Sequence, residues 1–97
     1  MATVVYAAAA LAGLERILTP VACENPRLAA VTTRAISSAI EALAVHPLLG
    51  PRMHGDIREL VISCGQTGHI ALYRYRLLQD EVRVLAIGAQ REMGFVP

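Results

Sequence analysis

The chain has 97 residues, of which 55% are hydrophobic and 18% charged, and because a chain of this length forms one core, we expect a single domain over residues 1–97. Nine basic residues, all Arg, oppose eight carboxylates, and the net charge of +1 excludes the broad positive surface typical of nucleic-acid-binding proteins. The longest stretch without charge, Met1–Leu14, is shorter than the ~20 residues of a membrane-spanning helix, so the excess of hydrophobic residues indicates a partner protein rather than a membrane.

The N-terminal region predicts a strand that leads into a helix. Thr3–Tyr6 is short and rich in β-prone residues, and an Ala-rich segment follows at once. Pro20 cannot donate a helical hydrogen bond, so we expect this helix to kink there or to end near Leu18. The helix is amphipathic, since one arc of its projection collects the apolar residues Ala7, Ala10, Leu11, Leu14, Ile17, Leu18 and Val21.

A second helix is predicted from Pro26 to Val45. Asn25 can cap the first free amides, and proline fits the first helical position without losing a hydrogen bond. The short connection between the two helices predicts an antiparallel hairpin. The apolar arc of the second helix contains Leu28, Val31, Ala35, Ile36, Ala39, Ile40, Ala42 and Leu43.

The last third of the chain predicts a three-stranded antiparallel meander. His46–Pro51 ends the second helix, and the segment from Gly50 to Ile57 is predicted as a loop. Three apolar, β-prone runs follow with turn residues between them. These runs are Arg58–Ser63, His69–Arg76 and Val82–Gly88. We therefore expect an α+β fold whose helix hairpin packs on one sheet face.

The strands are apolar at nearly every position instead of alternating. A sheet covered on one side only should alternate between hydrophobic and polar residues. We therefore expect the second face to be covered too, either by the C-terminal tail or by a helix or strand of a partner.

Cysteine usage does not support a metal site. Cys23 and Cys64 lie outside any CxxC or Cys/His spacing, and we expect two buried free thiols in a reducing compartment. No metal and no cofactor are predicted. The N-terminus also lacks the basic start of a secretory signal, so we expect a cytoplasmic protein.

The order and spacing of these segments closely resemble the RelE/ParE family of bacterial type II toxins. The resemblance covers nearly the whole chain. It rests on the series NPRLA (Asn25–Ala29), AIEALAVHPLLGP (Ala39–Pro51), RELVIS (Arg58–Ser63), ALYRY (Ala71–Tyr75), VRVLAI (Val82–Ile87) and QREMGF (Gln90–Phe95). It implies a toxin held inactive in a hetero-oligomer by a cognate antitoxin. RelE-like members cut messenger RNA in the ribosomal A site, and ParE-like members poison DNA gyrase, so the fold does not decide the target.

The residues that a nuclease needs are mostly missing. Metal-free RNA cleavage requires a base, a cation for the phosphate and an acid, and RelE-like toxins place several of these in an ending similar to HQREAGY. In this chain the position of the His is Ala89 and that of the Tyr is Phe95. Ser63 and Cys64 end the strand where a RelE-like enzyme tends to place Arg. Only Arg91 matches, and it is the one catalytic candidate, with a structural salt bridge to Glu92 or Asp56 as the rival interpretation.

Other polar residues are candidates for binding the target or the antitoxin. The set is Arg58, Arg74, Arg76, Arg91 and Phe95. For Arg58 a structural role, paired at the sheet edge or anchoring the loop, is favoured over catalysis. Arg74 and Arg76 alternate along the strand in step with Ile70 and Leu72, so we expect all four side chains on the sheet face away from the helices. Two interpretations of the arginines remain there, binding of a partner and simple solvation.

The remaining aromatic and imidazole side chains are assigned structural roles. Tyr73 and Tyr75 are expected in the core with hydroxyls at its rim. His46 is expected to end a helix, and His54 and His69 to take loop or strand-end positions.

Three hypotheses for function follow from these observations. The favoured one is a ParE-like toxin that binds gyrase and is not an enzyme. The alternatives are a RelE-like ribosome-dependent endonuclease acting on mRNA, and a degenerate, non-toxic scaffold that only binds a partner.

Overall fold

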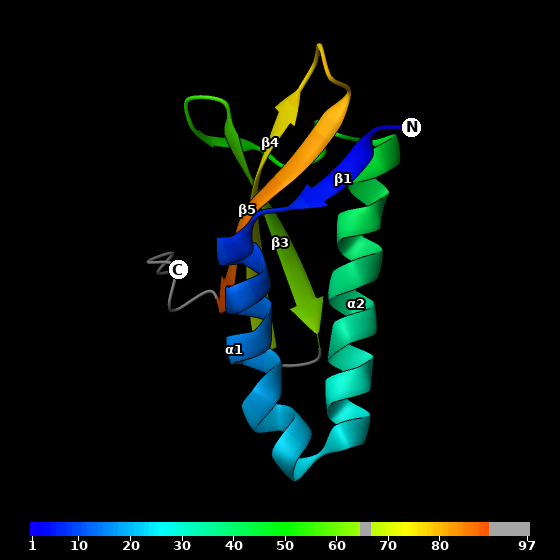
Figure 1. Ribbon diagram of the computed structural model, residues 1–97, viewed down its shortest axis with the longest axis vertical. Coiled ribbons are helices and arrows are strands. Elements are labelled where there is room, and N and C mark those ends of the chain that lie inside the picture. The colour runs from blue at the N-terminus through cyan, green and yellow to red at the C-terminus, as the bar shows by residue number, and fades with distance from the viewer. Residues whose placement is uncertain (65–66, 90–97) are drawn as a thin grey trace.

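The computed structural model describes residues 1–64 and 67–89 and has an α+β fold (Figure 1). The predicted order of strand, helix hairpin and meander is confirmed. The elements are β1 (Thr3–Tyr6), α1 (Ala8–Glu24), α2 (Pro26–Val45), β2 (Arg52–His54), β3 (Ile57–Cys64), β4 (Thr67–Arg76) and β5 (Glu81–Ala89).

The strands form one mixed sheet in the order β1-β5-β4-β3-β2. The meander β3-β4-β5 is antiparallel throughout, whereas β1 pairs in parallel with β5 and places Val4 opposite Val82. The segment predicted as a loop between Gly50 and Ile57 contains the extra strand β2, which pairs Arg52 with Arg58. Its residues are all exposed, so no alternation of hydrophobic residues marked β2 in the sequence.

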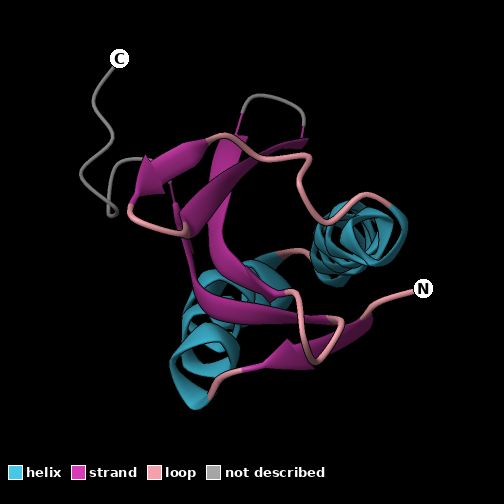
Figure 2. Cartoon of the chain, turned by 90° about the horizontal axis from the view of Figure 1, so that it is seen from above, coloured by secondary structure: helices cyan, strands magenta, loops and turns pink. Residues whose placement is uncertain are grey.

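Both helices cover the same face of the sheet (Figure 2). α1 packs mainly on β5, and α2 packs on β3 and β1. The core between these layers contains Ala10, Ile36, Ile40, Leu43, Leu60, Ile62, Ala71, Tyr73, Val82, Val84 and Ile87. Because successive strand residues point to opposite faces, the odd-numbered residues of β4 from Ala71 to Tyr75 face this core.

A glycine sets the distance between α1 and the sheet. Gly13 is buried in the middle of α1, and a Cβ atom there would overlap the carbonyl oxygen of Ile87 on β5. The missing side chain therefore lets the helix backbone lie directly on the strand. Sequence analysis did not identify this position, because glycine carries no apolar signal.

The predicted bounds of α2 are confirmed, and of the two alternatives for α1 the early end near Leu18 is excluded. α2 begins at Pro26, and the side chain of Asn25 accepts a hydrogen bond from the Leu28 amide at 3.1 Å, so the predicted cap is confirmed. α1 does not end near Leu18, since it continues through Pro20 to Glu24. Pro20 is exposed, and one lost hydrogen bond there does not stop the helix.

The hydrophobic arc of α2 is buried over only part of its length. Ile36, Ile40 and Leu43 are at most 1% exposed, whereas Leu28 and Val31 are 48% and 53% exposed. Leu28 and Val31 therefore belong to the predicted apolar arc but not to the core. The hairpin extends beyond the end of the sheet (Figure 1), so the first turns of α2 have no strand beneath them.

By length and composition alone, α2 would also be able to cross a membrane. Its Ile36, Ile40 and Leu43 instead belong to the core cluster. A core helix buried against a sheet carries the same hydrophobic residues, so we assign α2 this role.

Candidate interaction surfaces

The sheet face away from the helices is apolar at one end and charged at the other. The register places Ile70 and Leu72 on this face with Arg74 and Arg76 further along β4. Polarity thus changes along the strand rather than between its two faces. The expected position of Arg74 and Arg76 on this face is confirmed, and at its apolar end Val61, beside Ile70, is 52% exposed.

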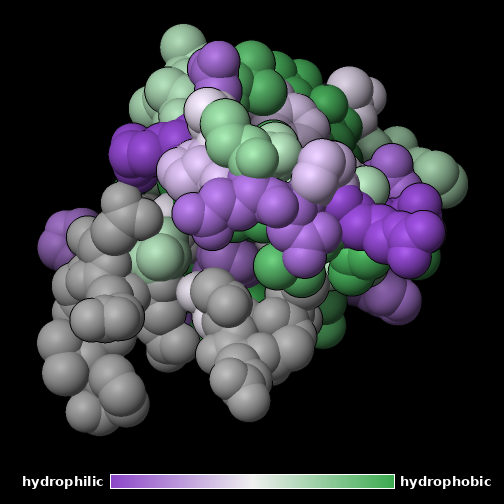
Figure 3. Space-filling view, turned by 90° about the horizontal axis from the view of Figure 1, so that it is seen from below, coloured by the Kyte–Doolittle hydropathy of each residue, from purple (hydrophilic) through white to green (hydrophobic). Residues whose placement is uncertain are grey.

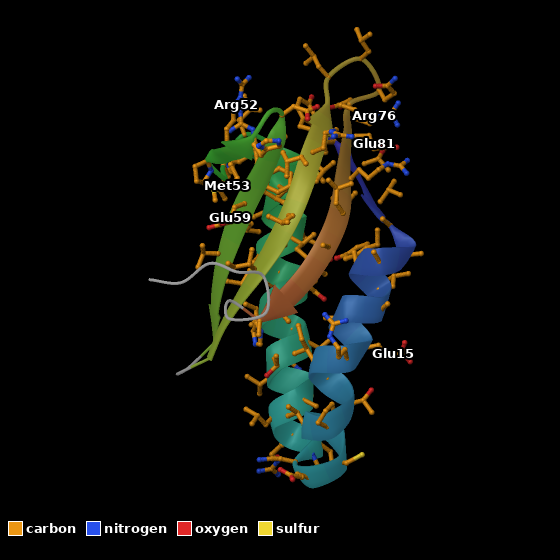
Figure 4. The ribbon with its side chains drawn as sticks, turned by 90° about the vertical axis from the view of Figure 1, so that its left-hand side faces the viewer. Glu15, Arg52, Met53, Glu59, Arg76 and Glu81 are labelled. Carbon is orange, nitrogen blue, oxygen red and sulfur yellow. The ribbon has the colours of Figure 1, made fainter. Side chains whose placement is uncertain are left out.

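The arginines of the charged half are paired with carboxylates, and Figure 4 labels Arg76 and Glu81 of this set. Arg74 Nε lies 2.9 Å from Asp56 Oδ2, while Glu81 Oε1 lies 3.0 Å from Arg83 Nε and 3.6 Å from Arg76 Nη1. The hydrogen bond from Arg83 is the main cause of the lowered pKa of Glu81, and the charges of Arg83 and Arg76 lower that pKa further. The binding candidates Arg74 and Arg76 therefore lie on the predicted face, but each already has a carboxylate partner.

Arg58 anchors the loop between α2 and β2. Its Nη1 donates to the carbonyl oxygen of Gly50 at 2.7 Å and to that of Leu48 at 3.3 Å. Of the roles proposed for Arg58 from the sequence, the anchoring of this loop is confirmed. The guanidinium faces the loop carbonyls, so it holds the loop on the sheet.

The two tyrosines of β4 differ in burial. Tyr73 is fully buried, and its hydroxyl accepts a hydrogen bond from the Gly50 amide at 2.9 Å. Burial raises the pKa of Tyr73, against smaller lowering effects of the Gly50 amide and the Arg58 charge. Tyr75 is partly exposed and donates to Asp80 Oδ1 at 2.7 Å, a hydrogen bond that raises the pKa of Tyr75. The predicted core ring is confirmed for Tyr73, although its hydroxyl is buried rather than at the rim. The Tyr75 ring packs against the core and its hydroxyl lies at the exposed rim.

The histidines and the described cysteine take structural or exposed positions. His46 caps the C-terminus of α2, as predicted, and its amide donates to Ala42. His54 is exposed at the end of β2, and His69 is 4% exposed on the core side of β4. Cys23 is an exposed free thiol at the hairpin tip, which corrects the prediction that it is buried. Over residues 1–64 and 67–89, no three His, Cys, Asp or Glu side chains gather where they could hold a metal ion.

Two of the predicted site residues, Arg91 and Phe95, lie outside the described residues. The same is true of the Glu92 proposed to pair with Arg91. Its other proposed partner, Asp56, pairs with Arg74. Of the positions compared with the nuclease ending, Ala89 is described and is the last residue of β5.

A shallow apolar groove follows one side of α1. It measures about 350 Å³ and is lined by Leu11, Leu14, Glu15, Leu18, Thr19 and Ala22. Leu11 is 53% exposed, although it belongs to the predicted apolar arc of the helix. The apolar arc of α1 is wider than the strip that meets β5, and this width is the signal in the sequence that indicates the groove.

The exposed turns of α2 combine apolar and cationic side chains. Arg27, Val31 and Arg34 have the spacing of one helix face, and Leu28 lies beside them. Neither Arg27 nor Arg34 has a hydrogen-bond or ion-pair partner among the residues that the structure describes. Seen from below, the hairpin end of the molecule carries hydrophobic surface next to hydrophilic surface (Figure 3). An amphipathic segment with acidic residues would complement such a surface.

Comparison with known proteins agrees with this architecture. No curated protein matches the chain. The family model described as ParE toxin of type II toxin-antitoxin system, parDE, matches residues 4–94, which include every helix and strand except the first residue of β1. The chain therefore belongs to the ParE toxin family of type II toxin–antitoxin systems.

Proposed function

We propose that the chain is a cytoplasmic toxin that a cognate antitoxin neutralises and that acts by binding DNA gyrase rather than by cutting RNA. The observation that carries the choice of target is the charged half of the sheet. There Arg74, Arg76 and Arg83 are each paired with a carboxylate, so phosphate groups would have to displace Asp56 and Glu81. Binding to RNA draws much of its affinity from free cations, whereas binding to a protein does not depend on them.

A gyrase supercoiling assay with the purified protein tests this choice. We expect loss of supercoiling together with trapped cleavage complexes, and no cleavage of messenger RNA on translating ribosomes. Cleavage in the ribosomal A site that disappears with Arg91→Ala would instead identify a RelE-like nuclease. If neither target is affected at saturating protein and induced expression leaves growth unchanged, the chain is a non-toxic scaffold.

The antitoxin is proposed to cover the hairpin through the groove on α1 and the Arg27 and Arg34 side of α2. The exposed Leu11 is the residue that this contact would bury. Full burial of a leucine contributes about 1.5–3 kcal/mol, which corresponds to roughly 10-fold to 100-fold in affinity.

Variants of exposed leucines test this antitoxin surface. Leu11→Ser should weaken binding of the protein encoded by the adjacent gene by about 10-fold or more, measured by calorimetry. Leu78→Ser is the matched control, because Leu78 is 94% exposed in the turn between β4 and β5. Equal affinity for the Leu11→Ser variant and the wild type would exclude the groove as the antitoxin surface.

A further inference from the structure

The loop between α2 and β2 is held rigidly at the end of the molecule that lies opposite the hairpin tip (Figure 1). Two side chains hold its Gly50. The hydroxyl of Tyr73 accepts from the Gly50 amide, and Arg58 donates to the Gly50 carbonyl. The Glu59 amide also donates to the Pro51 carbonyl at 3.0 Å. These bonds fix the backbone on both sides of Gly50, where a Cβ atom would collide with the carbonyl of Glu59.

This fixed loop presents hydrophobic side chains to solvent. Leu48 and Leu49 are 60% and 57% exposed, and nearby Leu77 is 75% exposed. A flexible loop could turn such residues inward, but the Arg58 bond to the Leu48 carbonyl holds the backbone in place. An exposed apolar group on an ordered backbone is preorganised for binding, since little further entropy is lost on docking.

Two hollows adjoin these leucines and share Leu48 and Tyr75 as their common wall. The first has a volume of about 220 Å³ and is lined by Leu48, Arg52, Asp56, Arg58, Tyr75 and Leu77. The second has a volume of about 430 Å³ and is lined by Val45, His46, Pro47, Leu48, Leu49 and Tyr75. The first mixes apolar walls with charges, and the second is mostly apolar. We call the two together the loop hollow.

The charge of the loop hollow is positive. Arg52 and Arg58 lie directly opposite one another on β2 and β3, an arrangement of like charges that is unfavourable unless an anion is near. Asp56 does not relieve it, because it pairs with Arg74. Among the described residues, Arg52 has no partner, and its side chain lies exposed at the β2 edge beside Met53 (Figure 4).

We propose that the loop hollow docks a segment of another protein in which an apolar side chain stands next to carboxylates. The apolar side chain would enter between Leu48 and Tyr75, and a carboxylate would pair with Arg52. Arginine binds carboxylates through two parallel hydrogen bonds, which would fix the direction of the segment. This surface is separate from the hairpin groove and stands independently of the gyrase and antitoxin proposals.

The charges and shape argue against two other occupants. A second copy related by a two-fold axis would bring the Arg52 side chains of both copies to the same contact, which adds repulsion. Nucleic acid would gain little from the apolar walls of Leu48, Leu49 and Leu77, since phosphate contacts require cations. An acidic segment with an apolar anchor matches both the positive charge and the apolar walls of the loop hollow.

The probe for this proposal is a short synthetic peptide that alternates leucine and glutamate, titrated into the isotope-labelled 97-residue protein. We expect amide shifts at Leu48, Leu49 and Tyr75. The dissociation constant should rise about 10-fold or more in the Arg52→Glu variant, because the reversed charge replaces an attraction with a repulsion. Arg16→Glu, at an exposed position of α1 that lines neither the loop hollow nor the hairpin groove, is the matched control and should leave the affinity unchanged. A peptide with serine in place of leucine tests the apolar part and should bind more weakly.

The outcomes separate this proposal from its rivals. Shifts that map to Leu11 and Leu18 would assign the peptide to the hairpin and overturn the proposal, as would equal binding to wild type and Arg52→Glu. Shifts at Leu48 that depend on protein concentration without peptide would identify self-association instead. The folding of the Arg52→Glu variant is checked by NMR, because the amide signals of its core residues should match those of the wild type. Because the readout uses neither gyrase nor antitoxin, failure of those proposals would leave this result unchanged.

Discussion

The two halves of α2 carry similar hydrophobic residues but meet different surroundings. In the C-terminal half, Ile36, Ile40 and Leu43 are buried on the sheet, whereas in the N-terminal half Leu28 and Val31 are about half exposed. The difference arises because the hairpin extends past the strands (Figure 1). Amphipathic spacing thus specifies which side of a helix is apolar, while the length of the sheet decides how much of that side becomes core.

Substitutions to alanine in the two halves of α2 test this comparison most strongly. Ile40→Ala should lower the free energy of unfolding by about 2–5 kcal/mol, because it leaves a cavity in the core. Val31→Ala should change it by no more than about 0.5 kcal/mol. Urea denaturation of both variants measures the difference. Similar losses in both would show that Val31 is buried in solution, for example by self-association.

A substitution of Pro20 tests the part of the hairpin that lies beyond the sheet. Pro20→Ala restores an amide that can donate within α1, and because the site is exposed, we expect a gain of up to about 3 kcal/mol. The neighbouring Thr19→Ala serves as the control, with a change within about 0.5 kcal/mol. A loss of stability with Pro20→Ala would mean that the proline shapes a needed bend.

Removal of the Tyr73 hydroxyl tests the opposite, well-packed end of the molecule. Tyr73→Phe leaves the buried Gly50 amide without its acceptor, so the free energy of unfolding should fall by about 1–3 kcal/mol. Tyr75→Phe removes a hydroxyl bonded to Asp80 at the exposed rim, so it should lower the free energy of unfolding by less than Tyr73→Phe does. Thermal unfolding of both variants checks this order, and the reverse order would contradict the anchoring role of Tyr73.

The smallest expected effect is the pH-dependent contribution of the Glu81 carboxylate to stability. The pKa of Glu81 is lowered in the folded state from its ordinary value of 4.5. The carboxylate therefore adds stability that is full above pH 4.5 and is lost as the pH falls through the lowered folded pKa. The Tm of Glu81→Gln should lie below that of the wild type at neutral pH and approach it on acidification. If the Tm of the Glu81→Gln variant differed from that of the wild type by the same amount at every pH, the ion pairs of Glu81 would be excluded as the source of the difference.

The candidate surfaces were only partly predictable from the sequence. The parity of Arg74 and Arg76 on β4 correctly indicated the sheet face that they occupy, but their pairing with Asp56 and Glu81 depends on a turn and on a neighbouring strand. Leu11 was placed in the apolar arc of the first helix, but the groove beside it was not predicted, since periodicity cannot show where a helix leaves its sheet. The loop hollow could not be predicted, because Leu48 and Tyr75 are far apart in the sequence and meet only through the anchor of Gly50.

By itself, the sequence determined the class of the fold, the bounds of α2 and the three strands of the meander, because capping, proline placement and β-branched runs act between neighbouring residues. It also carried enough of the family pattern to indicate a type II toxin. Only the tertiary structure decided the parallel pairing of β1 with β5, the strand β2 and the contact of Gly13 with Ile87. These features join segments distant in the chain, and their energies depend on which surfaces meet when the layers pack.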